Sequence, residues 1–378
     1  MEHTFIVAEL SANHNGSISL AKRTILAAKE AGADAVKLQT YTADTITIDS
    51  HRECFVEKGG LWDGYTLYDL YKKAFTPWEW HKELFDYATS LSLQCFSTPF
   101  DFTAVDFLES IGNPIYKIAS FEITDVNLIR YAARLHKPMI ISTGVATLSD
   151  LELAVRTCRE EGNDDITLLK CTSAYPAPLE KANLLTIPDI SRRFGVKVGV
   201  SDHSMTDSIA LTAVALGATV VEKHLILDRS MGGPDSGFSM EPDEFARMCK
   251  SIREVELVRG SAHYPAEDEE IPGRRACRSL FICEDMKKGE VLTAQNLRSI
   301  RPGCGLHPKY LNDCLGKTVN RDLEKGIADL EKKVAAFKVA VRKHRDIDSG
   351  EIESACGDVR EAATRLENLW FECFATAD

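Results

Sequence analysis

Short apolar runs alternate with helix-period segments over the first 260 residues of the chain. The runs are rich in Val, Ile and Ala, which is typical of strands buried on both faces of a parallel sheet. Eight are predicted, at Phe5–Leu10, Ala33–Gln39, Gln94–Thr98, Ile115–Ser120, Pro138–Thr143, Ile166–Cys171 and twice within Val196–Leu225. Eight β–α units favour an α/β fold of the (β/α)8 TIM-barrel type, with a doubly wound open sheet as the alternative. No GxGxxG motif follows the first run, which argues against a dinucleotide-binding fold.

Helix starts and one irregular segment complete this pattern. Ser17 or Ser19 can cap the first helix, because a serine hydroxyl can accept a hydrogen bond from a free N–H group of the first turn. Thr76-Pro77 predicts a helix with proline at its first helical position. Residues 42–76 break the alternation and show no clear helical stripe. We interpret them as an insertion over the mouth of the barrel.

The rest of the chain is predicted to be organised differently. The expected divisions are a TIM-barrel domain at 1–260, a linker at 261–275, a small domain at 276–330 and a tail at 331–378. Within the small domain, Met286–Leu292 predicts a turn leading into a strand. A unit this small is expected to pack against another surface. The tail is charged and free of proline, with Leu366, Trp370 and Phe374 at helical spacing, so we predict a helical segment of unknown role.

Composition narrows the possible functions. The net charge is −12 and no long basic run occurs, so nucleic acid is not expected as a partner. Eleven cysteines without CxxC spacing are typical of reduced thiols in a cytoplasmic protein. The N-terminus lacks the apolar stretch of a signal peptide, and no run is long enough to span a membrane. We therefore expect a soluble, cytoplasmic protein without a membrane partner.

Polar residues stand at the end of every predicted strand. They are Glu9, Lys37 and Gln39, Ser97 and Thr98, Lys117 and Ser120, Ser142 and Thr143, Thr172 and Ser173, Asp202 and His203, and Glu222 and His224. Because parallel strands end at one edge of the sheet, all of them are expected to face the same mouth. His203 and His224 follow neighbouring strands and together suit a divalent transition metal. The alternative is two unrelated histidines, one of them a satisfied core residue.

With these motifs in this order, the chain resembles the sialic acid synthase family. The matching pieces are Ala8-Glu9, Asn13-His14-Asn15-Gly16, Ala31-Gly32-Ala33-Asp34, Lys37 with Gln39, Ser97-Thr98-Pro99-Phe100, Tyr116-Lys117-Ile118, Ser142-Thr143-Gly144, Ser201-Asp202-His203, Glu222-Lys223-His224 and Gly233-Pro234-Asp235. Lys288-Gly289-Glu290 and Arg301-Pro302-Gly303 resemble the family's antifreeze-like (SAF) domain. The likeness covers residues 4–330 and implies a TIM barrel followed by an SAF domain.

Two stretches, Glu9–His14 and Leu61–Leu70, resemble the pseudaminic acid synthase branch of the family. The resemblance implies condensation of phosphoenolpyruvate with 2,4-diacetamido-2,4,6-trideoxy-L-altrose, giving a nonulosonic acid and phosphate by C–O cleavage. N-acetylneuraminate and legionaminate synthesis are the alternatives within the family. Two positions depart from the pattern. Ser173 stands where neuraminate synthases have an asparagine near the phosphate, and Gly326–Asp329 lacks the usual Gly-Thr-Pro-Leu.

The resemblance also implies roles for individual residues. Glu9 would be the general base or orienting carboxylate. His203 and His224 would bind a divalent metal that polarises the sugar aldehyde; Mn²⁺ is the expected ion, with Mg²⁺ and Co²⁺ as alternatives. The residues implied to bind phosphoenolpyruvate are Lys37, Thr98, Lys117, Ser120, Ser142, Ser173, Ser201 and Glu222. Those implied to bind the sugar are Gln39, Tyr175, Asp235 and Arg301. Arg301 would reach the sugar from the other subunit of a domain-swapped homodimer.

Other interpretations remain open. A Schiff-base aldolase would need a lysine with a depressed pKa in an apolar setting, and the histidine pair argues against it. A non-catalytic carbohydrate-binding barrel is a further alternative. The presence of Glu9, Lys37, His203 and His224 argues against it. Glu9 could also serve structurally as a partner of Lys37. We expect the insertion at 42–76 to select the sugar, and a 6-deoxy substrate would favour an apolar patch there.

Overall fold

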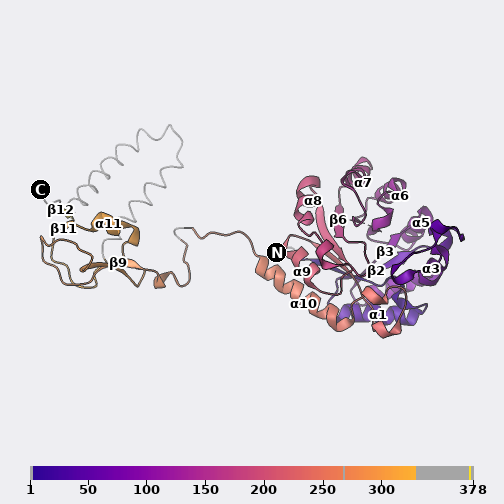
Figure 1. The fold of residues 1–378 in the computed structure, drawn as a ribbon, viewed down its shortest axis with the longest axis horizontal. Coiled ribbons are helices and arrows are strands. Elements are labelled where there is room, and N and C mark those ends of the chain that lie inside the picture. The colour runs from indigo at the N-terminus through magenta and orange to yellow at the C-terminus, as the bar shows by residue number, and fades with distance from the viewer. Residues whose placement is uncertain (1–2, 267–268, 329–373, 376–378) are drawn as a thin grey trace. The chain divides into compact units, whose positions relative to one another are not determined.

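The computed structural model describes residues 3–266, 269–328 and 374–375. The chain divides into two compact units, Met1–Ser261 and Ala262–Asp378. The first unit is a closed barrel of eight parallel strands in sequence order, in which the first strand pairs with the eighth. Helices surround the strands (Figure 1). The predicted (β/α)8 barrel is therefore confirmed.

The elements of the barrel follow the predicted alternation. Its strands are β1 (Phe5–Glu9), β2 (Ala35–Thr40), β3 (Gln94–Pro99), β4 (Tyr116–Ile118), β5 (Met139–Ser142), β6 (Ile166–Cys171), β7 (Lys197–Asp202) and β8 (Val220–His224). Its helices are α1 (Ile18–Glu30), α2 (Ala43–Ile46), α3 (Leu67–Ala74), α4 (Trp78–Ser90), α5 (Phe102–Ser110), α6 (Val126–Ala133), α7 (Leu148–Glu160), α8 (Thr186–Phe194), α9 (Ser208–Ala215) and α10 (Pro242–Arg259).

The barrel interior changes from apolar to polar along the strands. Successive residues of a strand point to opposite faces, so every second residue enters the barrel. One interior layer is an apolar cluster of Val7, Ala35, Phe96, Ile115, Ile140, Leu169 and Val220. The positions two residues further along those strands are Glu9, Lys37, Thr98, Lys117, Ser142, Cys171 and Glu222. The alternation that packs the core therefore also brings polar groups together at the carboxyl ends.

The same alternation places two strand-end residues on the outside of the barrel. Ser97 is hydrogen bonded to Thr40 through their hydroxyls at 2.7 Å, and the Thr40 hydroxyl lies 2.8 Å from Nε2 of His81 in α4. Asp202 accepts a hydrogen bond from Lys223 at 2.5 Å, and both side chains are fully buried. The expectation that every strand-end polar residue faces the mouth is wrong for Ser97 and Asp202, because their neighbours in sequence occupy the inward positions.

Helix boundaries agree with the sequence only in part. Ser17 caps α1, as one of the two proposed serines. Pro77 is the N-cap of α4 and not its first helical residue, so that prediction is off by one position. The segment 42–76 contains α2 and α3, which contradicts the absence of a helical pattern there. Within the eight-residue helix α3 only Leu70 is fully buried, which explains why no apolar stripe stood out.

The second unit has its own small core. Its elements are β9 (Ser279–Ile282), β10 (Leu297–Ile300), α11 (Leu311–Cys314), β11 (Thr318–Val319) and β12 (Phe374–Ala375). The pairs β9–β10 and β11–β12 are antiparallel. The core consists of Leu280, Ile282, Met286, Leu292, Leu297, Leu306, Cys314 and Val319. A separate apolar cluster is what a distinct domain requires.

Two predictions for this unit are wrong. Met286 and Val291 form isolated bridges, with Leu323 and Thr318, so Met286–Leu292 does not lead into a regular strand. Phe374 lies in β12, where a helix was expected. The rest of the predicted tail, including Leu366 and Trp370, lies outside the described residues.

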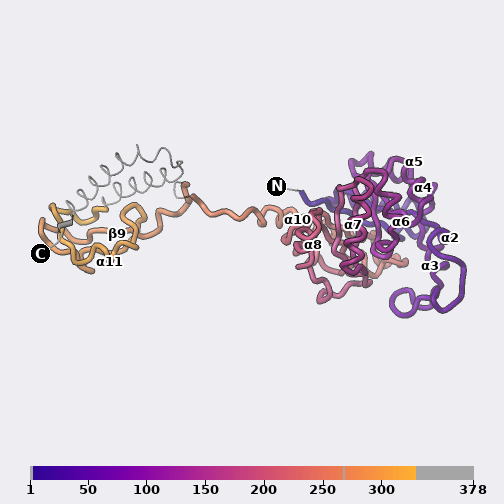
Figure 2. Tube along the Cα trace, turned by 90° about the horizontal axis from the view of Figure 1, so that it is seen from above, coloured from indigo at the N-terminus to yellow at the C-terminus, as the bar shows by residue number. Residues whose placement is uncertain are grey.

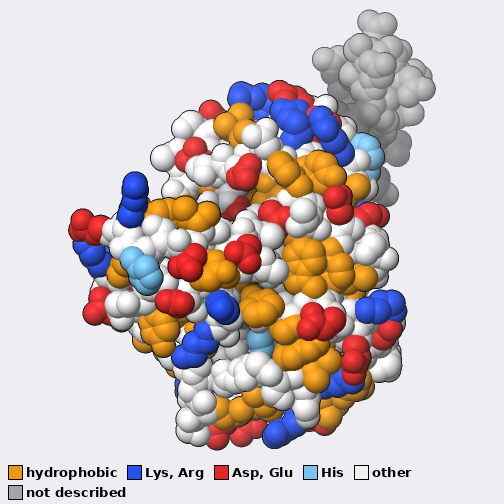
Figure 3. Space-filling view, turned by 90° about the vertical axis from the view of Figure 1, so that its right-hand side faces the viewer, with side chains coloured by type: hydrophobic (Ala, Val, Ile, Leu, Met, Phe, Trp, Pro, Cys, Tyr) orange, Lys and Arg blue, Asp and Glu red, His pale blue; other side chains and the backbone are white. Residues whose placement is uncertain are grey.

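The surface and the helices add two observations. No helix among the described residues has both the length and the apolar character needed to cross a bilayer. On the face shown in Figure 3, Lys and Arg side chains stand among Asp and Glu, with hydrophobic side chains between them. That face carries no area of uniform charge.

Candidate active site

Four charged side chains, one each from β1, β2, β4 and β8, meet inside the barrel mouth. The ammonium of Lys37 lies 2.5 Å from Oε2 of Glu9 and 3.4 Å from Oε2 of Glu222. The ammonium of Lys117 lies 3.3 Å from Oε1 of Glu222. None of the four side chains is more than 6% exposed. Buried charges are costly unless they are paired, so two carboxylates and two ammonium groups stabilise each other here.

The two carboxylates of this network are made unequal by their surroundings. Burial raises the pKa of Glu9, although Lys37 opposes it, whereas Lys117 and Lys37 outweigh burial and lower the pKa of Glu222 to about 2. Glu222 also accepts a hydrogen bond from the Ser201 hydroxyl at 3.0 Å. Titratable pairs whose pKa values are pushed apart often divide acid–base roles between them. Glu9 is therefore the more basic carboxylate of the pair.

Glu9 is oriented from both sides. Its Oε1 accepts a hydrogen bond from the backbone N–H of Ser11 at 2.8 Å, while Oε2 faces the Lys37 ammonium. Lys37 also donates to the Thr98 hydroxyl at 3.3 Å. The structural pairing of Glu9 with Lys37 therefore exists, and it lies within the candidate site.

A cradle of hydroxyl groups surrounds Gly144 beside this network. The Gly144 N–H donates to the Ser120 hydroxyl at 3.1 Å. A Cβ atom at Gly144 would lie only 2.1 Å from Oγ of Ser173 and 2.9 Å from Oγ of Ser120. The Ser142 hydroxyl is buried without a hydrogen-bond partner. The missing side chain thus lets the Ser173 and Ser120 hydroxyls lie close to the Gly144 backbone, which gathers donors of the kind that an anionic group with several oxygens needs.

The two histidines converge at the same mouth. The ring centroids of His203 and His224 are 5.2 Å apart, and both residues are buried. Nδ1 of His224 has no hydrogen-bond partner, and Nδ1 of His203 lies 3.8 Å from Sγ of Cys171. Burial lowers the pKa of His203 to about 3 and that of His224 well below its usual range. Both imidazoles are therefore neutral at pH 7, which is the form that binds metals.

This pair fits a metal with open coordination positions. Imidazole nitrogens lie about 2.1 Å from a bound metal, which puts two rings on one ion at a centroid spacing of roughly 5 Å. Within the described part of the chain, no group of three or more His, Cys, Asp or Glu residues suits a metal ion. The protein would therefore contribute two nitrogen ligands, unlike a structural zinc site with four protein ligands.

The predicted sugar-binding residues are placed in two units. The Tyr175 ring lies 4.6 Å from that of His203, and Oδ2 of Asp235 accepts hydrogen bonds from the Ser11 hydroxyl and from the Ala12 N–H. Gln39 follows Lys37 by two positions in β2 and therefore also points inward. Arg301 belongs to the second unit, where it is exposed.

The sequence analysis missed three further groups at the mouth. Glu122 ends a 3-10 turn at Ser120–Glu122, its Oε2 is buried without a partner, and burial raises its pKa to about 7. Its position two residues after Ser120 was a usable signal. The Phe238 ring lies 4.8 Å from that of His224, and the Trp62 ring 5.5 Å from that of Tyr175. Trp62 lies in the stretch Leu61–Leu70 that the resemblance had marked, although no role was given to it, whereas no sequence motif marks Phe238.

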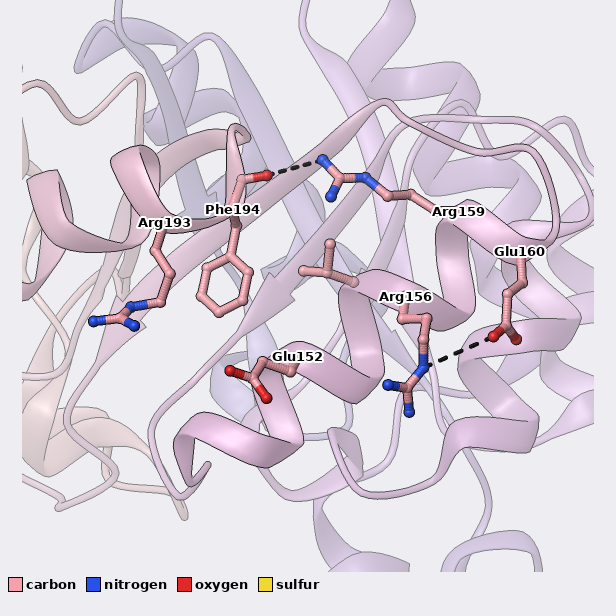
Figure 4. A pocket seen from close by; sticks show the side chains of 7 residues that line it. Glu152, Arg156, Arg159, Glu160, Arg193 and Phe194 are labelled. Atoms are coloured by element: carbon pink, nitrogen blue, oxygen red, sulfur yellow. Dashed lines mark hydrogen bonds and ion pairs between the residues drawn. The ribbon is translucent and has the colours of Figure 1, made fainter.

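A separate surface groove between α7 and α8 is not a comparable site. Figure 4 shows its lining side chains, among them Arg156, Arg159 and Glu160. Arg159 donates to the Phe194 carbonyl at 2.8 Å, and Arg156 lies 3.8 Å from Glu160 (Figure 4). These cations already have partners, and the groove lies on the outside of the barrel, away from the strand ends.

Comparisons with known proteins agree with this arrangement. The family model described as the NeuB family matches residues 24–264, and the model of the SAF domain matches residues 278–326. The chain is 48% identical to pseudaminic acid synthase of Helicobacter pylori, over 84% of this chain and 94% of that protein. It is 38% identical to N,N'-diacetyllegionaminic acid synthase of Legionella pneumophila, over 85% and 92%.

One solved structure extends the comparison to three dimensions. The crystal structure of N-acetylneuraminic acid synthetase from Leptospira borgpetersenii, in complex with citrate, is 31% identical in sequence. The match has a TM-score of 0.64 and covers 70% of this chain and 88% of that chain.

Proposed function

Because the chain belongs to the NeuB family, we propose that it catalyses the pseudaminic acid synthase reaction. It would join phosphoenolpyruvate to 2,4-diacetamido-2,4,6-trideoxy-L-altrose and release phosphate by C–O cleavage. The observation that carries this proposal is the 48% identity to a pseudaminic acid synthase across nearly its whole length. The identity to a legionaminic acid synthase over a similar length is 38%, which favours the pseudaminic branch.

The charged network and the hydroxyl cradle support binding of phosphoenolpyruvate. This substrate carries roughly three negative charges, and a buried site must supply cations and donors for them. Lys37 and Lys117 supply the cations, and the hydroxyls beside Gly144 supply donors for phosphate oxygens. Thr98 and Ser201 hold Lys37 and Glu222 in place.

The histidine pair supports a divalent metal, and Mn²⁺ is the ion we propose. Bound by His203 and His224, it would act as a Lewis acid on the aldehyde oxygen of the ring-opened sugar. The neutral state of both rings and the unpartnered Nδ1 of His224 support this assignment.

Glu9 has the position and basicity for proton transfer. In the proposed reaction C3 of phosphoenolpyruvate attacks the aldehyde carbon, whose oxygen takes up a proton and becomes a hydroxyl group, and water adds at C2. Glu9 accepts the proton of that water, because burial raises its pKa and Ser11 fixes its direction. Phosphate then leaves with the electrons of the C2–O bond as the new C2 hydroxyl group releases its proton and becomes the keto group, and Lys37 and Lys117 stabilise the charge of the phosphate.

We also propose a role for the second unit. Arg301, on its exposed loop, would reach the N-acyl group of a sugar bound in the other subunit of a domain-swapped homodimer. A chain ending at residue 261 should then lose sugar turnover, and full activity of that chain would overturn the role of Arg301. A cytoplasmic location fits the nine cysteines of the described residues, all of which are free.

Phosphate release tests the proposed reaction. The enzyme is incubated with phosphoenolpyruvate and either the 6-deoxy diacetamido sugar or N-acetylmannosamine, with EDTA or with added Mn²⁺. We expect turnover of the 6-deoxy sugar, loss of activity with EDTA and recovery with Mn²⁺. Preference for N-acetylmannosamine would overturn the sugar, EDTA-insensitive turnover would overturn the metal, and no phosphate release would favour a binding protein.

Borohydride treatment tests the aldolase alternative. Burial lowers the pKa of Lys117, which is one property of a Schiff-base lysine. However, its ammonium lies 3.3 Å from Glu222, a contact that favours the charged form. We expect no covalent trapping of substrate on Lys117, and a trapped adduct at this residue would overturn the proposed chemistry.

A further inference from the structure

One loop of the insertion carries an aromatic side chain to the barrel mouth. The loop Glu57–Tyr65 is closed at its base by the bridge between Val56 and Thr66 and by the hydrogen bond from the Glu57 N–H to the Tyr65 carbonyl at 2.9 Å. Figure 2 shows this part of the chain projecting beyond α3. Its tip is the 3-10 turn Gly60–Trp62.

Trp62 is fixed to the far side of the mouth. Its indole N–H donates to the carbonyl of Pro234, in the loop that follows β8, at 2.9 Å. Its ring lies 5.5 Å from Tyr175 and 6.5 Å from Phe238. The loop after β2 thus meets the loops after β6 and β8 through three aromatic rings.

These rings form a continuous wall down to the two imidazoles. Tyr175 contacts the His203 ring at 4.6 Å, and Phe238 contacts the His224 ring at 4.8 Å. No direct contact joins Trp62 to either histidine among the ring pairs of the described residues, so Trp62 is the outer member of the wall. A sugar with its aldehyde carbon at the imidazoles and its carbon chain along this wall would have its other end at Trp62.

The chemistry of this outer position is apolar. The only hydrogen-bond donor of the indole is used by Pro234, and the phenyl ring of Phe238 has none. A methyl group against these faces leaves water at no polar cost, whereas a hydroxyl group would lose its hydrogen bonds to water. Selection against an added hydroxyl in an apolar pocket reaches about 10²-fold.

We propose that Trp62 is the residue that selects the 6-deoxy end of the sugar. Its indole face packs against the C6 methyl group and disfavours sugars that carry a 6-hydroxyl group. The inference rests on the proposed function, because it assumes that an open-chain amino sugar is bound with its aldehyde at the imidazoles.

The test compares two sugars that differ only at C6. The wild type and the variants Trp62→Gln and Trp62→Phe are assayed for kcat/KM with the 6-deoxy sugar and with its 6-hydroxy counterpart. We expect the preference for the 6-deoxy sugar to fall about tenfold or more in Trp62→Gln and to persist in Trp62→Phe, which keeps an apolar ring. The ratio of the kcat/KM values for the two sugars does not depend on the fraction of enzyme that is folded.

A matched control uses a tryptophan outside the mouth. Trp78 donates to the Tyr41 carbonyl at 3.2 Å and stacks on Phe107 of α5, so Trp78→Phe should leave the ratio unchanged. An unchanged ratio in Trp62→Gln would overturn the inference while the proposed function stands. A wild type that does not use the 6-deoxy sugar would instead overturn the proposed function.

Discussion

The two ends of the barrel hold charged side chains in opposite ways. At the amino end, Asp34 accepts hydrogen bonds from the Ile6 N–H and from Arg253, each at 2.8 Å. Glu256 accepts from the Thr4 N–H at 2.6 Å. These side chains are between 11% and 29% exposed, and none has a buried atom without a partner.

At the carboxyl end the charges are more deeply buried and less completely paired. The Glu9, Lys37, Lys117 and Glu222 side chains are at most 6% exposed. Nearby, Ser142, Glu122 and His224 each have a buried polar atom without a hydrogen-bond partner. Unpartnered buried groups cost free energy, so their concentration at one end indicates a surface built for a ligand. The amino end, in contrast, serves stability.

The largest effect is expected when a lysine at the carboxyl end is replaced, and a lysine at the amino end serves as its control. Lys37→Met leaves the carboxylates of Glu9 and Glu222 without the cation between them and removes a charge for phosphoenolpyruvate. We expect kcat/KM for phosphoenolpyruvate to fall about 10²–10³-fold in a phosphate-release assay. Lys197→Met, which breaks an exposed 2.9 Å pair with Asp165 at the start of β7, should leave activity unchanged. Equal losses in both variants would remove the distinction.

The next effect tests whether the Ser173 and Ser120 hydroxyls beside Gly144 contribute to substrate binding. Gly144→Ala places a Cβ atom against the hydroxyls of Ser173 and Ser120. We expect kcat/KM for phosphoenolpyruvate to fall about 10²-fold, because displaced contacts at the reacting group are costly. Adding Ser173→Ala removes the closest clash, at 2.1 Å, and should restore part of the loss. Wild-type kinetics in Gly144→Ala would contradict the cradle.

A carboxyl group at each end of the barrel should change stability with pH in opposite directions. Burial raises the pKa of Glu122 to about 7, so the folded state retains a proton that the unfolded state loses above about pH 4.5. The free energy of unfolding therefore falls as pH rises from about 4.5 to about 7, by up to about 3 kcal/mol at roughly 1.4 kcal/mol per pKa unit. Glu122→Gln should abolish this decline in urea unfolding measured at several pH values.

Glu256 provides the comparison at the amino end. Although burial opposes it, the Thr4 N–H and Arg253 lower the pKa of Glu256. Its contribution is therefore present at neutral pH and is lost as the pH falls through the folded-state pKa. Glu256→Gln should flatten the acid side of the stability profile. The same slope change in both Gln variants would contradict the assignment of opposite environments.

The smallest effect concerns the amino end alone. Arg253→Met removes the contacts to Asp34 and to the Thr4 carbonyl, each at 2.8 Å. Because these groups are partly exposed, we expect a loss of about 1–2 kcal/mol in unfolding free energy. Activity per folded molecule should be unchanged. A lower specific activity of the variant, measured at a temperature low enough for all of it to be folded, would contradict this.

The charged residues at the carboxyl end of the barrel could be predicted from the sequence. Glu9, Lys37, Lys117 and Glu222 could be placed at one mouth because strand alternation and parallel order are local rules. Their pairing distances could not be predicted, since they depend on the closed barrel. Ser97 and Asp202 were assigned to the mouth, although strict alternation from Thr98 and Ser201 would have placed them outside.

What the chain determined by itself is therefore the order of the strands and the residue types at their ends, because a two-residue period and the flanking helix signals are written in neighbouring positions. What only the tertiary structure decided is how residues far apart in sequence meet: Trp62 with Pro234, Gly144 with Ser173, and the ring of Phe238 with that of His224. These contacts join separate loops across the closed barrel, and no local pattern specifies them.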